Sequence, residues 1–321
     1  MKQRVLVTGA GGFIGHHFIK FLKKRGYWVR GADIKFPEFE KTSADEFLKL
    51  DLREYKNCFK ATKEVNHVYN FAANMGGIGF IEMVHAEVVR DNLLINNHML
   101  EASKNNKVKR FFFSSSACIY PTYRQKGTKN SGLKESYAYP AECDNEYGWE
   151  KLITERQCKN YYTDYGLETR VARFHNVYGP LGTWRGGREK SPAAICRKVA
   201  LADNGGTIDV WGDGKQGRSY TYIDDCCVGI YKLMTSDYRE PLNIGSDRLV
   251  SINQLIAILS KIAKKKVKKN YDLSKPQGVR GRNSDNTLIK KILKWAPSTS
   301  LEEGFKYTYE WINGQIKLEV K

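Results

Sequence analysis

A glycine-rich turn between an apolar strand and an amphipathic helix constrains the fold of this chain more than any other feature. Val5 to Val7 is a short apolar run that predicts a buried strand. Phe13 to Lys24 then carries apolar residues at helical spacing, and Tyr27 to Ile34 predicts a second strand. The turn between the first strand and the helix contains Gly9, Gly12 and Gly15. Such a βαβ beginning predicts a parallel sheet with right-handed crossovers.

Strand and helix patterns continue to alternate up to Asn176. Strands are predicted at 67–73, 108–114 and 167–174, and helices at 92–103 and 146–162. Three consecutive phenylalanines in the strand at 108–114 indicate a sheet that is covered on both faces. Beyond Asn176, the segment 179–191 is rich in glycine and charge and predicts a loop. Helices are predicted at 252–261 and 286–295, and the basic run 264–269 is interpreted as a solvated loop.

Composition limits the class of protein. The 321 residues include 41% hydrophobic ones, enough for a sizeable core, and no apolar run approaches the ~18 residues of a membrane span. The net charge of +18 favours anionic partners, but no basic motif of a nucleic-acid module is present. Seven cysteines without a repeated C-x-x-C pair, and no signal-peptide pattern, predict reduced thiols in the cytoplasm and no metal site.

The glycine turn also predicts a dinucleotide site. Glycine lets a pyrophosphate approach the backbone, and the start of the helix offers N–H groups to the phosphates. Asp33 ends the second strand 18 residues after Gly15. A carboxylate there accepts hydrogen bonds from an adenosine ribose and repels a 2′-phosphate, so NAD is favoured over NADP, although Arg30 and Lys35 lie close by. The predicted NAD-binding residues are Gly9, Gly12, Phe13, Ile14, Gly15 and Asp33.

Two further positions extend this cofactor prediction. Asp51 and Leu52 follow another apolar stretch and are candidates to meet the adenine. A simple strand-end turn explains the same pair of residues equally well. Both interpretations stay open on the sequence.

A tyrosine and a lysine four residues apart indicate a redox centre. Tyr147 and Lys151 share one face of a predicted helix. A nearby cation favours the phenolate, which makes tyrosine a usable base near neutral pH. Ser116 stands at the carboxyl end of a predicted strand, on the sheet edge where open α/β sheets bind ligands, and its hydroxyl can bond the reacting oxygen.

Together, the glycine turn, the serine strand end and the Y-x-x-x-K pair resemble the short-chain dehydrogenase/reductase family, and the chain length resembles its extended branch. Four strings, at 74–77, 115–121, 182–190 and 278–286, are similar to the GDP-mannose 3,5-epimerase family within that branch. The resemblance implies a Rossmann-type doubly wound parallel sheet with a smaller C-terminal α/β domain. The NAD-binding domain is expected at 1–176 plus about 219–245, and the nucleotide-sugar domain at 177–218 plus 246–321.

The resemblance also implies a mechanism. Tyr147, assisted by Lys151 and Ser116, would take the proton of the sugar C4 hydroxyl while NAD⁺ accepts hydride. The C4 ketone acidifies the hydrogens at C3 and C5. Inverting a carbon requires proton removal from one face and return to the other, and the matching residues of the family are Cys118 and Lys190. NADH then returns its hydride to C4, and the products are GDP-L-galactose, or GDP-L-gulose after inversion at C5 only.

Carried over residue by residue, the family's binding positions predict contacts with a GDP-sugar. They are Gly76, Ser116, Ala117, Cys118, Tyr147, Asn176, Glu189, Lys190, Lys198, Gln216, Arg218 and Arg282. Arginine forks suit a diphosphate. A homodimer is expected from the resemblance alone. Trp149, where the family tends to have leucine, is one departure that bears on substrate choice.

Three alternatives are weighed against this interpretation. A 4,6-dehydratase of the same branch places an Asp-Glu dyad where this chain has Ala117 and Cys118. Another NDP-hexose epimerase, acting at C4 alone, would leave Cys118 and Lys190 without a role. A non-catalytic NAD-binding protein on the same fold would not need Tyr147, Lys151 and Ser116.

Overall fold

A seven-stranded parallel sheet forms the centre of the protein. The computed structural model describes residues 3–129 and 132–319. The strand order is β11-β6-β5-β4-β1-β2-β3, and every neighbouring pair is parallel. The strands are β1 (Arg4–Thr8), β2 (Trp28–Asp33), β3 (Glu46–Lys49), β4 (His67–Asn70), β5 (Arg110–Ser116), β6 (Glu168–Phe174) and β11 (Leu242–Ile244). The predicted parallel, doubly wound sheet is confirmed.

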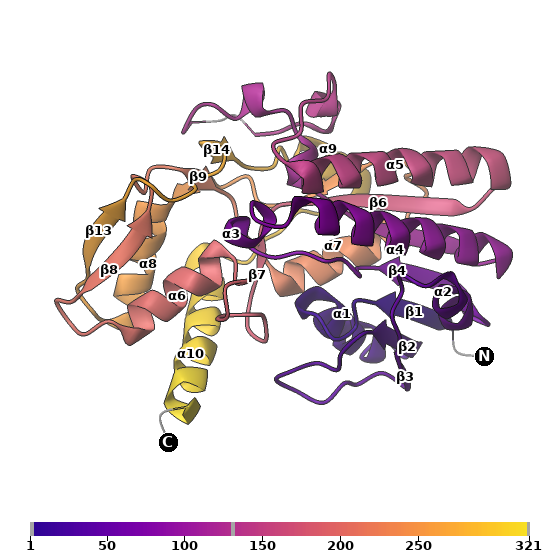
Figure 1. The fold of residues 1–321 in the computed structure, drawn as a ribbon, viewed down its shortest axis with the longest axis horizontal. Helices are drawn as coiled ribbons and strands as arrows, with labels where there is room; N and C mark the ends of the chain where they lie inside the picture. Colours follow the sequence, from indigo (N-terminus) through magenta and orange to yellow (C-terminus); the bar gives the residue numbers. More distant parts are fainter. Residues whose placement is uncertain (1–2, 130–131, 320–321) are drawn as a thin grey trace.

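Helices cover both faces of this sheet (Figure 1). They are α1 (Phe13–Lys23), α2 (Tyr55–Thr62), α4 (His85–Asn105), α5 (Glu146–Tyr165) and α7 (Ile223–Thr235). Helix α1 packs on α7, whereas α4 packs on α2 and α5. The side chain of Phe112 joins the core on the α1 side, and Phe111 and Phe113 join the core on the α4 side. The phenylalanine run therefore fills both layers because successive strand residues point to opposite faces.

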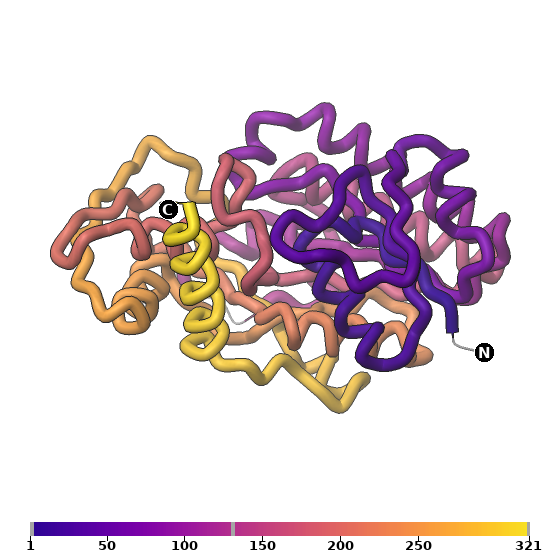
Figure 2. Tube along the Cα trace, turned by 90° about the horizontal axis from the view of Figure 1, so that it is seen from below, coloured from indigo at the N-terminus to yellow at the C-terminus, as the bar shows by residue number. Residues whose placement is uncertain are grey.

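A second group of elements lies beside one end of the sheet (Figures 1 and 2). It contains α6 (Ser191–Leu201), α8 (Ile252–Ala263) and α10 (Leu301–Glu319), which pack on one another. Strand β8 (Thr207–Trp211) pairs with β13 (Lys268–Asp272), and β9 (Gly217–Arg218) pairs with β12 (Val250–Ser251) and β14 (Gly281–Arg282). The remaining elements are α3 (Ile78–Ile81), β7 (Val177–Tyr178), β10 (Thr221–Tyr222) and α9 (Thr287–Leu293), besides three short 3₁₀ turns.

Some elements differ from the sequence prediction. Lys268 and Lys269, expected in a solvated loop, begin strand β13, and their side chains are exposed. Pairing of the backbone with β8 decides this segment, since exposed lysines give no strand pattern of their own. Helix α10 was not predicted, although Leu301, Phe305 and Ile312 recur on one face and are buried.

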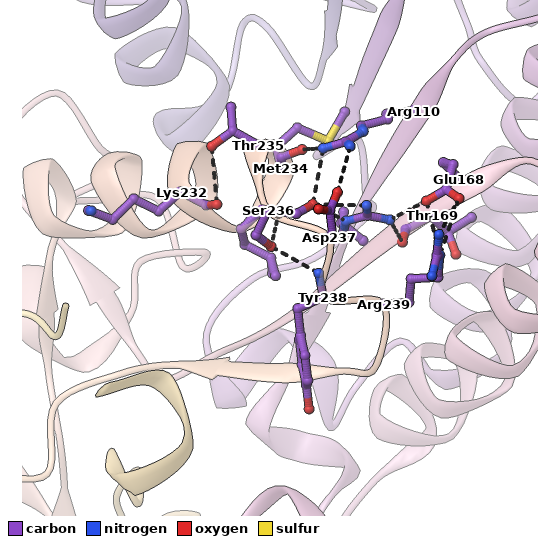
Figure 3. Close-up of polar contacts among 12 residues, drawn as sticks. Arg110, Glu168, Thr169, Lys232, Met234, Thr235, Ser236, Asp237, Tyr238 and Arg239 are labelled. Atoms are coloured by element: carbon purple, nitrogen blue, oxygen red, sulfur yellow. Dashed lines mark hydrogen bonds and ion pairs between the residues drawn. The ribbon is translucent and has the colours of Figure 1, made fainter. Parts of the chain in front are cut away.

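At the amino edge of the sheet, the half-buried Arg110 and the exposed Arg239 connect the end of α7 to the strands (Figure 3). Arg110 Nη1 donates to the carbonyl oxygens of Met234 (2.7 Å), in the last turn of α7, and of Ser236 (3.0 Å), the C-cap residue of this helix. Arg239 forms an ion pair with Glu168 at 2.8 Å. Cations at a helix C-terminus satisfy its free carbonyls. These contacts fix α7 against β5 and β6 at the edge opposite Ser116.

Candidate active site

The turn between β1 and α1 is built for close approach of a ligand to the backbone. Gly9 has φ of +64°, and the Gly12 N–H donates to its carbonyl oxygen at 3.0 Å. A methyl group on Gly15 would collide with the Gly9 carbonyl. The first turn of α1, Phe13 and Ile14 included, has no side-chain cap and no acidic residue. Its N–H groups are thus suited to an anion such as a pyrophosphate.

Asp33 closes this site at the end of β2. Its two carboxylate oxygens accept hydrogen bonds from the Gly11 N–H (2.9 Å) and the Lys35 N–H (3.1 Å). Burial raises the pKa of Asp33, and the backbone N–H donors act in the opposite direction. Arg30 points elsewhere, because its guanidinium binds Glu46 at 2.8 Å and the carbonyls of residues 61 and 63. The Asp33 carboxylate therefore faces the ribose position of the site, and Arg30 is not available there to bind a 2′-phosphate.

The second candidate pair for the cofactor lies just after β3. Asp51 forms an ion pair with Arg53 at 2.7 Å, and Leu52 is buried. Arg53 also reaches Asp91 on α4. Asp51 thus has a structural partner of its own.

Tyr147, Ser116 and Lys151 lie together at the carboxyl edge of the sheet. Helix α5 starts one residue before Tyr147, with Asn145 accepting the Gly148 N–H at 2.9 Å. The Ser116 side chain lies beside the Tyr147 hydroxyl and favours its ionised form. The Lys151 ammonium is buried and lies 5.3 Å from the centre of the Tyr147 ring. This is the arrangement that a proton-transferring tyrosine requires.

Burial governs the ionisation of Tyr147. Desolvation raises the pKa of its phenol well above the ordinary value, and the negative charge of Glu150 adds to this. The neighbouring Ser116 side chain lowers the Tyr147 pKa and so acts in the opposite direction. A further positive charge beside the phenol, such as an oxidised nicotinamide, is the kind of change that would favour the phenolate.

Glu150 is a site residue that the sequence prediction missed. Its carboxylate is buried and lies 3.5 Å from the Lys151 ammonium. It accepts hydrogen bonds from Asn92 (2.9 Å) and Asn96 (3.3 Å) on α4, and desolvation raises its pKa. Asn92 and Asn96 lie one helical turn apart, so their amides share one face of α4, and this pattern in the sequence could have indicated a buried polar partner. Glu150 is the counter-charge of Lys151.

Cys118 follows β5 in a 3₁₀ turn, and its N–H donates to Ser116 Oγ at 3.1 Å. Its sulfur accepts a hydrogen bond from Arg282 Nη1 at 3.1 Å. The other six cysteines are buried, and all seven are free thiols. Cys118 is therefore the cysteine that faces the site.

Lys190 is the N-cap residue of α6. Its ammonium is near enough to Cys118 and Lys151 for their charges to change its pKa. Desolvation lowers the pKa of its ammonium, and the Lys151 charge lowers it further, while a Cys118 thiolate raises it. An amine with a lowered pKa is a usable proton donor and acceptor near neutrality. The structure thus brings a thiol and an amine to the same site as Tyr147.

Two arginines add positive charge beside this thiol. Arg218 donates to the carbonyls of Gly217 and Val279, each at 2.7 Å. Desolvation and the neighbouring Arg282 lower the pKa of Arg218 to about 10. Gln216, two residues before Arg218, donates to the Trp211 carbonyl at 2.8 Å, while its own side-chain oxygen is buried without a partner in the described part of the chain. The cluster suits an anionic, hydrogen-bonding ligand.

The other predicted substrate residues occupy the surrounding loops. Asn176, with φ of +39°, donates to the Ser219 carbonyl at 3.0 Å, and Glu189 pairs with Arg197 at 2.7 Å. The loop of Gly76 joins the Glu189 loop, since the Gly77 N–H donates to the Arg188 carbonyl at 3.0 Å. Ala117 is buried beside Cys118.

Lys198 lies further out. It borders a groove of 610 Å³ with Trp211 and Tyr271, and its ammonium donates to the Asp209 carbonyl at 2.7 Å. A groove of 790 Å³ beside Gln3 and Trp28 contains none of the predicted site residues.

Neither a metal site nor a membrane helix is seen in residues 3–129 and 132–319. No cluster of three or more histidine, cysteine or acidic side chains capable of holding a metal ion occurs there. Likewise, none of the described helices is both long enough and apolar enough to cross a bilayer.

Comparisons with known proteins give consistent results. Residues 5–245 match the model of the NAD dependent epimerase/dehydratase family. GDP-mannose 3,5-epimerase 1 of Oryza sativa subsp. indica is 50% identical over 320 residues, covering 99% of this chain and 84% of that protein. UDP-glucose 4-epimerase of Thermotoga maritima, solved with UDP-glucose, is 27% identical with a TM-score of 0.88, covering 98% and 100% of the two chains. UDP-glucuronic acid 4-epimerase of Bacillus cereus, solved with UDP-glucuronic acid and NAD, is 26% identical with a TM-score of 0.83 over 98% and 100%.

Proposed function

This chain belongs to the NAD dependent epimerase/dehydratase family, and from that premise we propose that it converts GDP-mannose to GDP-L-galactose by inverting C3 and C5. Inversion at C5 alone gives GDP-L-gulose. The observation that carries the proposal is the placement of Cys118 and Lys190 beside Tyr147 and Lys151. A C4 epimerase has no use for this additional acid–base pair.

The glycine turn, the start of α1 and Asp33 would hold NAD. The glycines let the turn pack tightly against neighbouring backbone, the uncapped start of α1 would bind the pyrophosphate, and Asp33 offers its remaining lone pairs to ribose hydroxyls. Bound NAD supplies a reversible hydride acceptor for the sugar C4. The buried ammonium of Lys151 lies 4.9 Å from the centre of the Phe113 ring and 5.3 Å from that of the Tyr147 ring, so it places a positive charge beside the phenol.

Tyr147 and Ser116 act on the C4 oxygen. The phenolate of Tyr147 accepts the proton of the C4 hydroxyl as this carbon is oxidised, and the phenol returns it when the carbon is reduced. Ser116 lies beside Tyr147, and its hydroxyl would donate a hydrogen bond to the substrate oxygen. Lys151 stabilises the phenolate during the interval.

Cys118 and Lys190 exchange protons at the carbons next to C4. Beside a C4 carbonyl, the thiolate takes the hydrogen of C5 as a proton, and the electron pair stays on carbon as the enolate. The ammonium of Lys190 donates a proton to the opposite face of that carbon, which inverts it. The thiol then releases its proton to solvent and the amine takes one up, so the same removal and return at C3 completes the double epimerisation. Arg218, Arg282 and Gln216 would hold the GDP-sugar during these steps.

Assembly and location complete the proposal. We expect a homodimer through the α4–α5 face, because Leu94, Trp149 and Ile153 expose large apolar side chains on these two packed helices. Seven free thiols suit a reducing cytoplasm. The two-domain division at 1–176 plus about 219–245 against 177–218 plus 246–321 stays a prediction.

The decisive test supplies GDP-mannose in heavy water. We expect GDP-L-galactose carrying deuterium at C3 and C5, with no loss of water from the sugar. A dehydrated product would instead identify a 4,6-dehydratase, and inversion at C4 would identify a C4 epimerase. The Tyr147→Phe variant should form no product, whereas Tyr161→Phe, on the same helix but bonded to Glu101, should retain activity.

A further inference from the structure

One arginine links a carboxylate to the Cys118 thiol. Arg282 Nη1 donates to Cys118 Sγ at 3.1 Å, and Nη2 donates to Asp144 Oδ2 at 2.5 Å. Arg282 Nε is bound to Gln125 Oε1 at 2.6 Å. Because the guanidinium is buried, these three contacts fix its orientation. Its positive charge therefore acts on the Cys118 sulfur with little screening by water.

Asp144 takes no part in the proton transfers proposed for Tyr147, Cys118 and Lys190. It directly precedes Asn145, the N-cap of α5, so the helix that carries Tyr147 also positions this carboxylate. Its side chain is only 12% exposed. Its second oxygen, Oδ1, is buried and has no hydrogen-bond partner in the described part of the chain. The carboxylate therefore depends on Arg282, and Arg282 in turn shares its charge between Asp144 and Cys118.

The charges around the Cys118 sulfur are unbalanced without Asp144. Arg282, Arg218 and Lys190 all act on the thiol as cations. Tyr147 and Cys143 also lie within range, as groups that are neutral at neutral pH. The carboxylate of Asp144 bonds Arg282 and acts on Arg218 as well. This negative charge offsets part of the positive charge that Arg218 on β9 and Arg282 on β14 place near the sulfur.

This balance matters for a thiol that must both take and return a proton. Cations favour the thiolate, but a thiolate that is stabilised too strongly becomes a weak base. The most effective base is one whose protonated and deprotonated forms are both populated near the working pH. A carboxylate that shares the charge of Arg282 therefore limits how strongly the arginine favours the thiolate of Cys118.

We propose that Asp144 is a positioning residue that, through Arg282, limits the positive charge at Cys118 and thereby sets the pH at which the thiolate forms. The catalytic meaning of this assignment rests on the proposed function, in which Cys118 exchanges the proton at C5. The electrostatic relationship itself needs no substrate.

The test measures alkylation of Cys118 by iodoacetamide as a function of pH, with the modified peptide identified by mass spectrometry. In Asp144→Asn, the amide oxygen can still accept from Arg282, but the negative charge is gone. We expect the midpoint of alkylation to move to lower pH by about one unit. Asp144→Glu, which restores the charge, should return the midpoint toward that of the unaltered protein.

The matched control is Asp213→Asn. Asp213 pairs with Arg280 at 2.9 Å, two residues from Arg282 along the chain, so the substitution also removes a carboxylate from an arginine pair. Its midpoint should stay where it is in the unaltered protein. If Asp144→Asn does not fold, Asp144→Ser removes the same charge with a smaller side chain. An unchanged midpoint in the folded charge-removing variant, or an equal shift in Asp213→Asn, overturns the proposal.

A second measurement separates this proposal from the proposed function. Solvent deuterium exchange at C5 of GDP-mannose is measured as a function of pH in Asp144→Asn and in the unaltered protein. The optimum should move to lower pH together with the alkylation midpoint. If Cys118→Ala exchanges C5 normally, the proposed function fails, yet the alkylation result still decides whether Asp144 controls the thiol.

Discussion

The carbonyl oxygen of Cys118 lies directly over the α-carbon of Gly148, so close that a methyl group added to Gly148 would overlap it. Glycine at this position lets the first turn of α5 approach the turn after β5, which brings Tyr147 and Cys118 into one site. The first prediction follows from this approach.

Replacing Gly148 with alanine should destabilise the protein, although alanine normally stabilises a helix interior. The overlap with the Cys118 backbone should cost about 1–3 kcal/mol in the free energy of unfolding and lower the activity more than that loss explains. Gly314→Ala is the matched control, since nothing lies within 4 Å of the added methyl group on α10. It should stabilise by about 0.5–1 kcal/mol. Denaturant unfolding of both variants checks the opposite signs.

Replacing Cys118 with alanine should abolish deuterium exchange at C5 while NAD stays bound. The reason is that no thiolate remains to accept the proton, whereas the glycine turn and Asp33 are untouched. We expect a loss of at least about 10²-fold in product formation. Cys143→Ser, at a buried thiol bonded to the Ile119 carbonyl, is the control and should keep most activity. Normal exchange in Cys118→Ala would remove the cysteine from the mechanism.

Replacing Lys190 with alanine should have a different signature. The Cys118 thiolate can still remove a proton from C5, but nothing donates to the opposite face. Recovered GDP-mannose should therefore gain deuterium without inversion, while GDP-L-galactose falls by at least about 10²-fold. Lys306→Ala, at an exposed lysine on α10 that has no role in the site, is the control and should keep its activity. A product yield equal to that of the unaltered enzyme in Lys190→Ala would refute its role.

Replacing Asp33 with serine should weaken NAD binding and reduce the discrimination against NADP. The substitution removes the charge that repels a 2′-phosphate and the acceptor of the Gly11 and Lys35 N–H groups. We expect the dissociation constant of NAD to rise about tenfold or more, as measured by calorimetry, with a smaller rise for NADP. Equal rises for both cofactors would show that Asp33 only shapes the loop.

Stability should fall as the pH drops below 6.5, in part because of His175. Burial lowers the pKa of this histidine to about 3 in the folded protein, and its Nε2 bonds Asn243 at 3.1 Å. Between pH 6.5 and about 3 the unfolded chain binds a proton that the folded protein does not, so acid favours unfolding. The slope should be about 1.4 kcal/mol per pH unit from this residue. Denaturant unfolding at pH 6.5 to 4.5 should show a shallower slope for His175→Asn; equal slopes would exclude this imidazole.

Much of the fold was predictable because the signals are local. The glycine turn, the apolar strands and the helix from Glu146 depend on periodicities of two and 3.6 residues, and each was found close to its observed bounds. Helices α2, α6, α7 and α10 were not predicted. Their apolar stripes are short or mixed with charge, and packing on other elements decides them.

The site divides in the same way. Tyr147 and Lys151 are related by one helical turn, so the sequence alone places them together. The Glu150–Asn92–Asn96 network and the Asp144–Arg282–Cys118 chain join segments that are 54 to 164 residues apart. Contacts between residues so far apart in the sequence leave no periodic pattern from which they could be predicted.

By itself, the sequence determined the class of fold, the cofactor loop and the Tyr147–Lys151 pair, because turn chemistry and helical spacing act between near neighbours. Only the tertiary structure decided which charges surround those side chains. The burial of a group and the electrostatic field on it depend on every element that packs around it. In this protein, the packing of distant segments places Arg282 against the thiol of Cys118 and Asp144 against Arg282.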